Sequence, residues 1–248
     1  MLRRNERGNY RFLPGIAPYS CGAIADRGHE VVHVTFLEQP QWEEGFDKAR
    51  AYLHDAGLDR FALCGIELRC PSPYLLDGFI EFNRGYCELL QSWELYVDGI
   101  NPLARTNVAP THDAPPKTAM HGFSFVSPTT VHRSTFVVAG AGELRHGDLE
   151  EAEIVKEGDT TTGAMAEKAA FVAGVMAQRM SDLGGRWKEV TTVDVYTAHT
   201  LDETLTGAIL NGLGDARRHG FRWYPSRPPV VNIEFEMDMR AVKREVYI

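Results

Sequence analysis

The feature that most constrains the fold is one order of strands and helices that occurs twice along the chain. In the first half, a strand, a helix, a strand and a helix are predicted at residues 30–37, 41–57, 61–69 and 75–93. In the second half, the same order is predicted at residues 132–144, 164–185, 189–198 and 201–220, with a closing strand at 230–242. This alternation predicts the α+β class, with two helices on one face of each mixed sheet.

A constant offset relates the two halves. LHDAG lies over MSDLG at an offset of 127 residues, from Asp55 to Asp182, and GIELR lies over TVDVY at the same offset. One offset that holds through a helix end and the next strand predicts a tandem duplication. The segment THDAPPKTAM at 111–120 is polar, rich in proline and without periodicity, so we expect domains at 1–115 and 116–248.

The predicted strands carry apolar residues on both faces. VVHVTF at 31–36 and FVV at 136–138 are examples. Helices cover only one face of a sheet, so the other face needs a partner. We therefore expect assembly by packing of sheet against sheet.

Composition and charge exclude several classes of protein. The net charge of −8 disfavours binding to nucleic acid or to an anionic membrane surface. We expect no signal peptide and no membrane span, because the arginines near the start precede no long apolar run. The four cysteines match no zinc or redox spacing, which favours reduced thiols in a cytoplasmic protein.

Several short motifs, taken in order, resemble the RidA/YjgF family of reactive enamine/imine deaminases, and within it proteins of the 2-aminomuconate deaminase kind. The motifs are GIAPYSCG, FNRGYCELL, NPLARTNVAP, VVAGAGE and NIEFEMDMRAV. The resemblance implies chorismate-mutase-like domains, which in this family form trimers with sites in clefts between neighbouring units. A homotrimer of two-domain chains, or a higher homo-oligomer, is therefore expected.

The resemblance also implies roles for individual residues. Arg105 matches the arginine that grips the substrate carboxylate, and Glu234 matches the glutamate thought to position or activate water. The other matches are substrate-binding positions at Tyr19, Asn83, Asn107 and Gly140, the last through its backbone N–H. Asn107 stands where many members have cysteine.

Neither half matches the family pattern completely. The first half has HVTFLE in place of S-G-Q, and HGFSFVSP at 121–128 could close the first half or open the second. The second half lacks the arginine motif and offers only Arg222 or Arg227. The two halves are complementary, so we expect one composite site that both halves form.

Structural roles are the alternative for each of these residues. Arg105 could be a surface arginine, Tyr19 a packing residue, Asn83 a helix-face residue and Gly140 a strand-end glycine. Polar residues alternate with apolar ones in the closing strand, and this alternation alone predicts that Glu234 faces solvent. The nine histidines show no ligand spacing and no nucleotide-binding loop is present, so no metal and no cofactor are expected.

These observations predict an enzyme that hydrolytically deaminates a small enamine or imine carboxylate without a metal. The expected substrate is 2-aminomuconate or a substituted form from the degradation of aromatic amines. The chemistry needs a carboxylate anchor, a positioned water and a proton shuttle. The alternatives are a non-catalytic binder of small carboxylates, a general deaminase of 2-aminoacrylate-type enamines, and a chorismate-type hydrolase or lyase.

Overall fold

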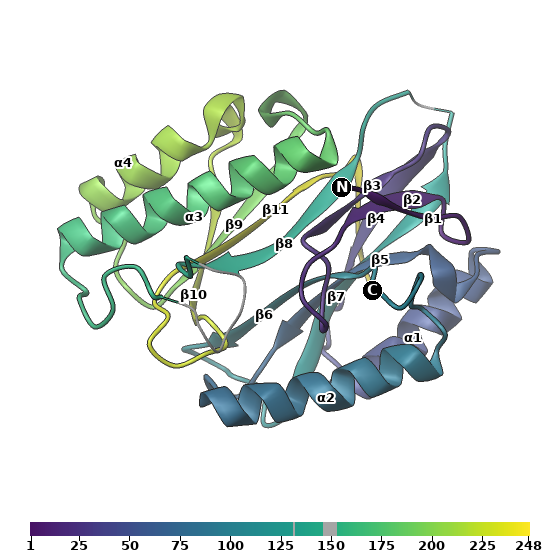
Figure 1. Cartoon of the computed structure of the whole chain (residues 1–248), viewed down its shortest axis with the longest axis horizontal. Helices are drawn as coiled ribbons and strands as arrows, with labels where there is room; N and C mark the ends of the chain where they lie inside the picture. Colours follow the sequence, from purple (N-terminus) through teal and green to yellow (C-terminus); the bar gives the residue numbers. More distant parts are fainter. Residues whose placement is uncertain (131, 146–152) are drawn as a thin grey trace.

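Twelve strands form one continuous mixed sheet in the computed structural model, which describes residues 1–130, 132–145 and 153–248 (Figure 1). The strands are β1 (Arg3–Asn5), β2 (Tyr10–Leu13), β3 (Gly22–Ala25), β4 (His29–Thr35), β5 (Leu63–Arg69), β6 (Ala104–Pro110), β7 (Ala119–Pro128), β8 (Phe136–Gly142), β9 (Thr192–Thr197), β10 (Arg222–Arg227), β11 (Glu236–Ala241) and β12 (Arg244–Tyr247). The helices are α1 (Trp42–Asp55), α2 (Leu76–Ser92), α3 (Thr162–Leu183) and α4 (Glu203–Gly212). The α+β class is confirmed.

One four-strand order occurs twice within this sheet. It is β6-β5-β7-β4 in one part and β10-β9-β11-β8 in the other. In both parts the first two strands are parallel and the other pairs are antiparallel. A short antiparallel contact between β10 and β6, of Ser226 with Pro110 and Arg227 with Ala109, joins the two parts.

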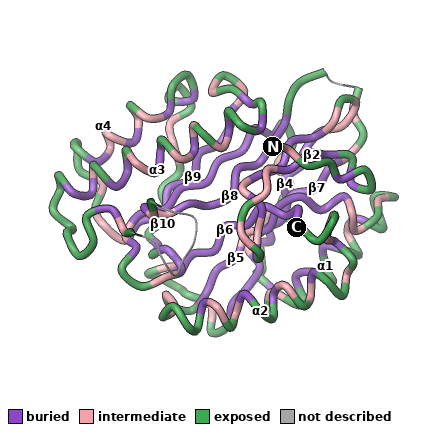
Figure 2. Tube along the Cα trace, in the orientation of Figure 1, coloured by how far each residue is buried: buried purple, intermediate pink, exposed green. Residues whose placement is uncertain are grey.

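The two parts lie face to face between two layers of helices. In Figure 1, α3 and α4 lie on one side of the strands and α1 and α2 on the other. Each helix pair packs on its own sheet through an apolar cluster, which includes Met176 of α3 in one layer and Phe46 of α1 in the other. In Figure 2 the central strands are mostly buried, whereas the outward faces of the helices are exposed; β1, β10 and β12 are largely exposed as well.

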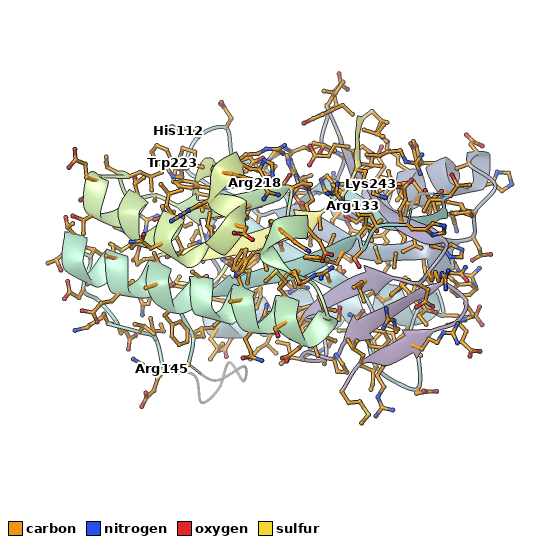
Figure 3. The ribbon with its side chains drawn as sticks, turned by 90° about the horizontal axis from the view of Figure 1, so that it is seen from above. His112, Arg133, Arg145, Arg218, Trp223 and Lys243 are labelled. Atoms are coloured by element: carbon orange, nitrogen blue, oxygen red, sulfur yellow. The ribbon has the colours of Figure 1, made fainter. Side chains whose placement is uncertain are left out.

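The inner faces of the two parts meet within the chain. A third apolar cluster lies between them, and Val31, Cys64, Ala104 and Val137 from four different strands contribute to it. The second sheet face, which we expected to need a partner, is thus covered largely by the other half of the same chain. Farther out, His112 and Arg145 project away from the layers at opposite edges of the molecule (Figure 3).

Strands also cross the predicted boundary at residue 115. The segment at 121–128 belongs to β7, which pairs with β4 and β5 and therefore completes the sheet of the first half. In the other direction, β3 pairs with β8, and β12 at the end of the chain pairs with β4.

The predicted strand at 230–242 is shorter than expected. Asn232 adopts a left-handed backbone with φ of 74°, and β11 begins only at Glu236. A left-handed residue interrupts extended backbone, so the turn separates Glu234 from the strand. None of the described helices is both long and apolar enough to cross a membrane.

Candidate active site

A cavity of about 320 Å³ lies where the first half of the chain meets the second. Tyr19, Arg105 and Asn107 line it from the first half. Gly140, Arg179 and Glu236 line it from the second half. Its volume fits a small molecule, and the predicted site residues Tyr19, Arg105, Asn107 and Gly140 come together here.

Arg105 lines this cavity with a guanidinium group that is only partly satisfied by the described residues. The residue is only 3% exposed, and its Nη2 donates a hydrogen bond of 2.7 Å to Oδ1 of Asn83 on α2. Its Nη1 is buried and has no hydrogen-bond partner in the described part of the chain. An unsatisfied buried donor on a cation is costly, so the geometry suits an anionic ligand that accepts from Nη1.

Aromatic rings surround the guanidinium of Arg105. Their centroids lie between 4.7 and 5.7 Å from its central carbon, and the rings belong to Tyr19, Phe79, Phe82 and Tyr86. Stacked rings stabilise the cation and hold its plane in one orientation. Burial raises the pKa of Tyr19, against the charges of Arg105 and Arg179, so its hydroxyl is neutral at pH 7.

Asn107 lies two residues beyond Arg105 on β6, so both side chains point to the same face of the strand. It is 3% exposed, and both its Oδ1 and its Nδ2 lack a hydrogen-bond partner among the described residues. Arg105 and Asn107 thus offer two donors and one acceptor to a ligand in the cavity.

Glu236 on β11 supplies the carboxyl group of the cavity. It is 5% exposed, and burial, followed by the negative charge of Asp238, raises its pKa to about 8. The positive charges of Arg179 and Arg105 oppose this shift only in part. Glu236 is therefore largely protonated at pH 7 and is poised to exchange a proton near neutrality.

Gly140 on β8 makes room for this carboxyl group. A Cβ atom at residue 140 would collide with Oε1 of Glu236 and would press on Thr106. The backbone N–H of Gly140 donates to Oγ1 of Thr106 at 3.1 Å, and Thr106 donates to Asp238 at 2.6 Å. The N–H that was expected to hold substrate is thus engaged by Thr106, and Gly140 contributes space.

Comparison with known proteins gives a consistent assignment. A family model described as 2-aminomuconate deaminase CnbZ matches residues 2–246. The chain belongs to the 2-aminomuconate deaminase family. A 2-amino-5-chloromuconate deaminase from Comamonas testosteroni is 36% identical over 244 residues, which cover 97% of this chain and 96% of that protein.

Two solved structures share less sequence identity with this family member. A chorismatase shares 12% identity, with a TM-score of 0.48 over 97% of this chain and 79% of its own. A cyanuric acid hydrolase shares 11% identity, with a TM-score of 0.40 over 88% of this chain and 69% of its own. Likeness at this level adds nothing to the assignment of the site.

Glu234, the expected catalytic residue, does not line the cavity of this 2-aminomuconate deaminase family member. Its carboxylate lies 2.8 Å from Nε2 of His199 and 3.6 Å from Arg227. Its backbone N–H donates to Oε1 of Glu143 at 2.7 Å. The carboxyl group that faces the cavity belongs instead to Glu236, two residues later.

The alternation in the closing strand wrongly predicted solvent exposure for its polar face. Glu236, Asp238 and Arg240 are 5%, 4% and 4% exposed. They are buried because the two halves of the chain bring their inner sheet faces together.

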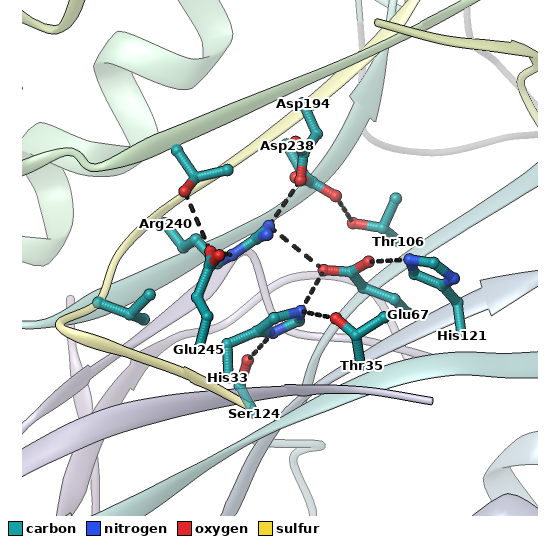
Figure 4. A network of polar contacts seen from close by, with 12 residues as sticks. His33, Thr35, Glu67, Thr106, His121, Ser124, Asp194, Asp238, Arg240 and Glu245 are labelled. Atoms are coloured by element: carbon teal, nitrogen blue, oxygen red, sulfur yellow. Dashed lines mark hydrogen bonds and ion pairs between the residues drawn. The ribbon is translucent and has the colours of Figure 1, made fainter. Parts of the chain in front are cut away.

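Figure 4 shows the polar network that occupies this interior. Arg240 Nη1 lies 2.6 Å from Asp194 and 3.5 Å from Glu67. Oxygen atoms of Glu67, Asp194 and Asp238 are close enough to share one metal ion, but the Arg240 guanidinium already supplies positive charge there. Burial, together with Glu67 and Asp194, raises the pKa of Asp238 well above its usual range.

Sequence reasoning missed Glu236, Arg179 and Thr106. Glu236 and Glu234 lie on the same polar face of the predicted closing strand, so the alternation alone could not distinguish them. Arg179 lies on α3 one turn after Val175, which also lines the cavity, and this i, i+4 spacing places both on one helix face.

Proposed function

We propose that the protein is a hydrolytic deaminase of 2-aminomuconate or a substituted 2-aminomuconate. The observation that carries the proposal is one cavity in which Arg105 Nη1 and the Asn107 amide have no hydrogen-bond partner among the described residues and burial raises the pKa of Glu236 to about 8. Membership of the 2-aminomuconate deaminase family supports the same chemistry.

In the proposed first step, Arg105 and Asn107 bind one carboxylate of the substrate. Nη1 of Arg105 and Nδ2 of Asn107 donate, and Asn83 keeps the guanidinium in place. The enamine then lies between the β6 wall and Glu236, which line opposite sides of the junction between the two halves. This arrangement orients the reacting carbon toward the only acidic side chain that lines the cavity in the described part of the chain.

Glu236 then moves the protons of the reaction. The protonated carboxyl gives its proton to the enamine carbon, which leaves an iminium ion and a carboxylate. The carboxylate takes a proton from water as the water oxygen bonds to the iminium carbon, forming a carbinolamine. Glu236 protonates the amino group, the C–N bond breaks, ammonia leaves, and the hydroxyl proton returns to Glu236 as the ketone forms. One water is consumed and the enzyme is regenerated, and no step of this scheme calls for a metal.

The register supports one composite site per chain, built from two YjgF-like units in tandem. The offset of 127 places Asp194 at the position of Glu67. Glu67 pairs in register with Thr106, and Asp194 pairs with Arg222. Phe221 and Trp223 therefore take the places of Arg105 and Asn107 in the second unit, which lacks their chemistry. The homotrimer stays a prediction from the family resemblance, and light scattering in solution would test it.

The deciding experiment measures ammonia release from 2-aminomuconate generated in situ, beside the simple enamines produced by dehydration of serine or threonine. We expect fast release from 2-aminomuconate and slow release from the simple enamines. Fast release from the simple enamines alone would favour a general deaminase. No acceleration of either would favour a carboxylate-binding protein.

A further inference from the structure

The cavity carries more positive charge than one carboxylate requires. Arg105 and Arg179 both line it, and neither has a carboxylate within ion-pair distance among the described residues. Glu236 is the acidic residue of the lining, and burial keeps it largely protonated at pH 7. Two guanidinium groups that line one cavity and form no ion pair among the described residues complement a ligand with two negative charges.

Arg179 is held in a defined orientation by the backbone of β8. Its Nη1 donates to the carbonyl oxygens of Ala139 at 3.0 Å and of Gly140 at 3.1 Å. Its Nε and Nη2 make no hydrogen bond within the described part of the chain. A guanidinium that is fixed by one nitrogen and free at the others is a preorganised donor for a planar anion.

The two arginines approach from different halves of the protein. Arg105 lies on β6 against α2, whereas Arg179 lies on α3 against β8. The two guanidinium groups therefore belong to different walls of one cavity of about 320 Å³. A short, extended molecule with an anionic group at each end fits this arrangement.

We propose that Arg179 is a specificity-determining residue that binds the second carboxylate of a dicarboxylate substrate, while Arg105 and Asn107 bind the first. This inference rests on the proposed function and deepens it, because it assigns substrate selectivity to a particular side chain. In this role Arg179 rejects enamines with a single carboxylate, since its donors then stay unsatisfied in a partly buried cavity.

The test compares two unreactive ligands that differ at one end. One is trans,trans-muconate, a six-carbon dicarboxylate without the amino group, and the other is sorbate, in which a methyl group replaces one carboxylate. Calorimetry at pH 7 would give the Kd of each for the wild type, for Arg179→Met and for Arg179→Lys. Arg227→Met is the matched control, because Arg227 lies in the same half but pairs with Glu234 outside the cavity.

We expect the wild type to bind muconate more tightly than sorbate. Arg179→Met should weaken muconate binding at least about tenfold and leave sorbate binding within about threefold, which follows from the loss of charge-assisted hydrogen bonds. The muconate affinity of Arg179→Lys should lie between those of the wild type and Arg179→Met, because lysine keeps the charge but loses the planar donor geometry. Arg227→Met should bind both ligands as the wild type does.

Equal weakening of both ligands would overturn the proposal, because it would mean that Arg179 only supports the β8 backbone. Unchanged muconate binding in both Arg179 variants would also overturn it. The binding test measures unreactive ligands, so it can support the role of Arg179 even if the protein shows no deaminase activity. Conversely, ammonia release from 2-aminomuconate by an Arg179→Met enzyme at the wild-type kcat/KM would reject this inference and leave the deaminase proposal standing.

Discussion

Gly140 and Glu236 are in direct contact, so closely that a Cβ atom at residue 140 would overlap Oε1 of the glutamate. The contact joins β8 to β11 at the cavity wall. It makes the position of the proposed proton donor depend on the absence of a side chain on the neighbouring strand. Catalytic groups that are displaced by about 1 Å commonly lose about 100-fold in rate, so this contact is a sensitive point of the site.

The substitution Gly140→Ala should therefore move the Glu236 carboxyl group. We expect kcat for 2-aminomuconate to fall by at least about tenfold, because the proton donor is misplaced relative to the enamine carbon. KM should change less, since Arg105 and Asn107 are untouched. Steady-state kinetics would measure both values, with Gly163→Ala as the control, because no atom lies near that Cβ position. A wild-type kcat would contradict the role assigned to the contact.

Glu236→Gln should abolish most of the activity and the pH dependence that accompanies it. The first step needs protonated Glu236, whose pKa is raised to about 8, so the wild-type rate should fall as the pH rises through 8. The variant should lose about 100-fold or more in kcat at pH 7 and keep its muconate affinity. Glu234→Gln separates the two glutamates, because wild-type turnover in Glu234→Gln and not in Glu236→Gln would support the structural assignment.

The same group should make the folded state less stable as the pH rises. The pKa of this carboxyl group has its ordinary value of 4.5 in the unfolded chain, whereas burial raises the pKa to about 8 in the folded protein. Between pH 4.5 and pH 8 the folded state binds more protons than the unfolded state. The contribution of this carboxyl group to the free energy of unfolding is therefore fully present below pH 4.5 and is lost as the pH rises through 8. This loss in the free energy of unfolding has an upper bound of about 5 kcal/mol. Urea denaturation at pH 5 and pH 9 should show a smaller loss of stability in Glu236→Gln than in the wild type.

Arg105→Lys should raise KM by at least about tenfold. A lysine supplies a point charge in place of a planar donor pair, and it cannot keep both the bond to Asn83 and a grip on the substrate. Arg222→Lys is the control, because Arg222 pairs with Glu245 outside the cavity. Equal KM values for Arg105→Lys and the wild type in initial-rate measurements would remove Arg105 from the substrate site.

Lys168→Met should destabilise the fold more than any surface change. Lys168 and Glu143 are both 0% exposed and lie 3.1 Å apart, and Glu143 also accepts from the N–H groups of Glu234 and Phe235. Removing one partner of a buried pair costs about 3–5 kcal/mol, because an unpaired charge stays behind. Chemical denaturation would measure this loss. Lys48→Met, which breaks an exposed pair with Glu44, should cost less than about 0.5 kcal/mol.

Much of the candidate site could be predicted from the sequence because its residues lie in short motifs that resemble those of the RidA/YjgF family, and the local geometry of these motifs agrees. The ARTNV segment is β-prone and flanked by turn residues, and the structure places it in β6 with Arg105 and Asn107 on one face. Asn83 lies on a helix whose apolar face includes Phe79 and Tyr86, so it points toward the strand that Arg105 occupies. The periodicity of each segment determined these directions.

The choice between Glu234 and Glu236 could not be predicted in the same way. Both residues lie on the same face of the predicted strand. The left-handed turn at Asn232, together with the register of β11, decides which of them reaches the cavity. Arg179 was missed because it comes from a helix of the other half, 74 positions beyond Arg105 in the chain. No local pattern relates two such residues.

The sequence by itself determined the amphipathic helices and the strands β4, β5, β6, β8 and β9, with Arg105 in β6, because these depend on backbone preferences and on the spacing of apolar residues. It did not predict β1, β2, β3, β10 or β12. Only the tertiary structure decided which polar residues are buried. The two inner sheet faces meet within one chain, which removes water from Glu236, Asp238 and Arg240. The raised pKa of Glu236 follows from that burial, so the acid proposed for catalysis arises from the packing of the two halves.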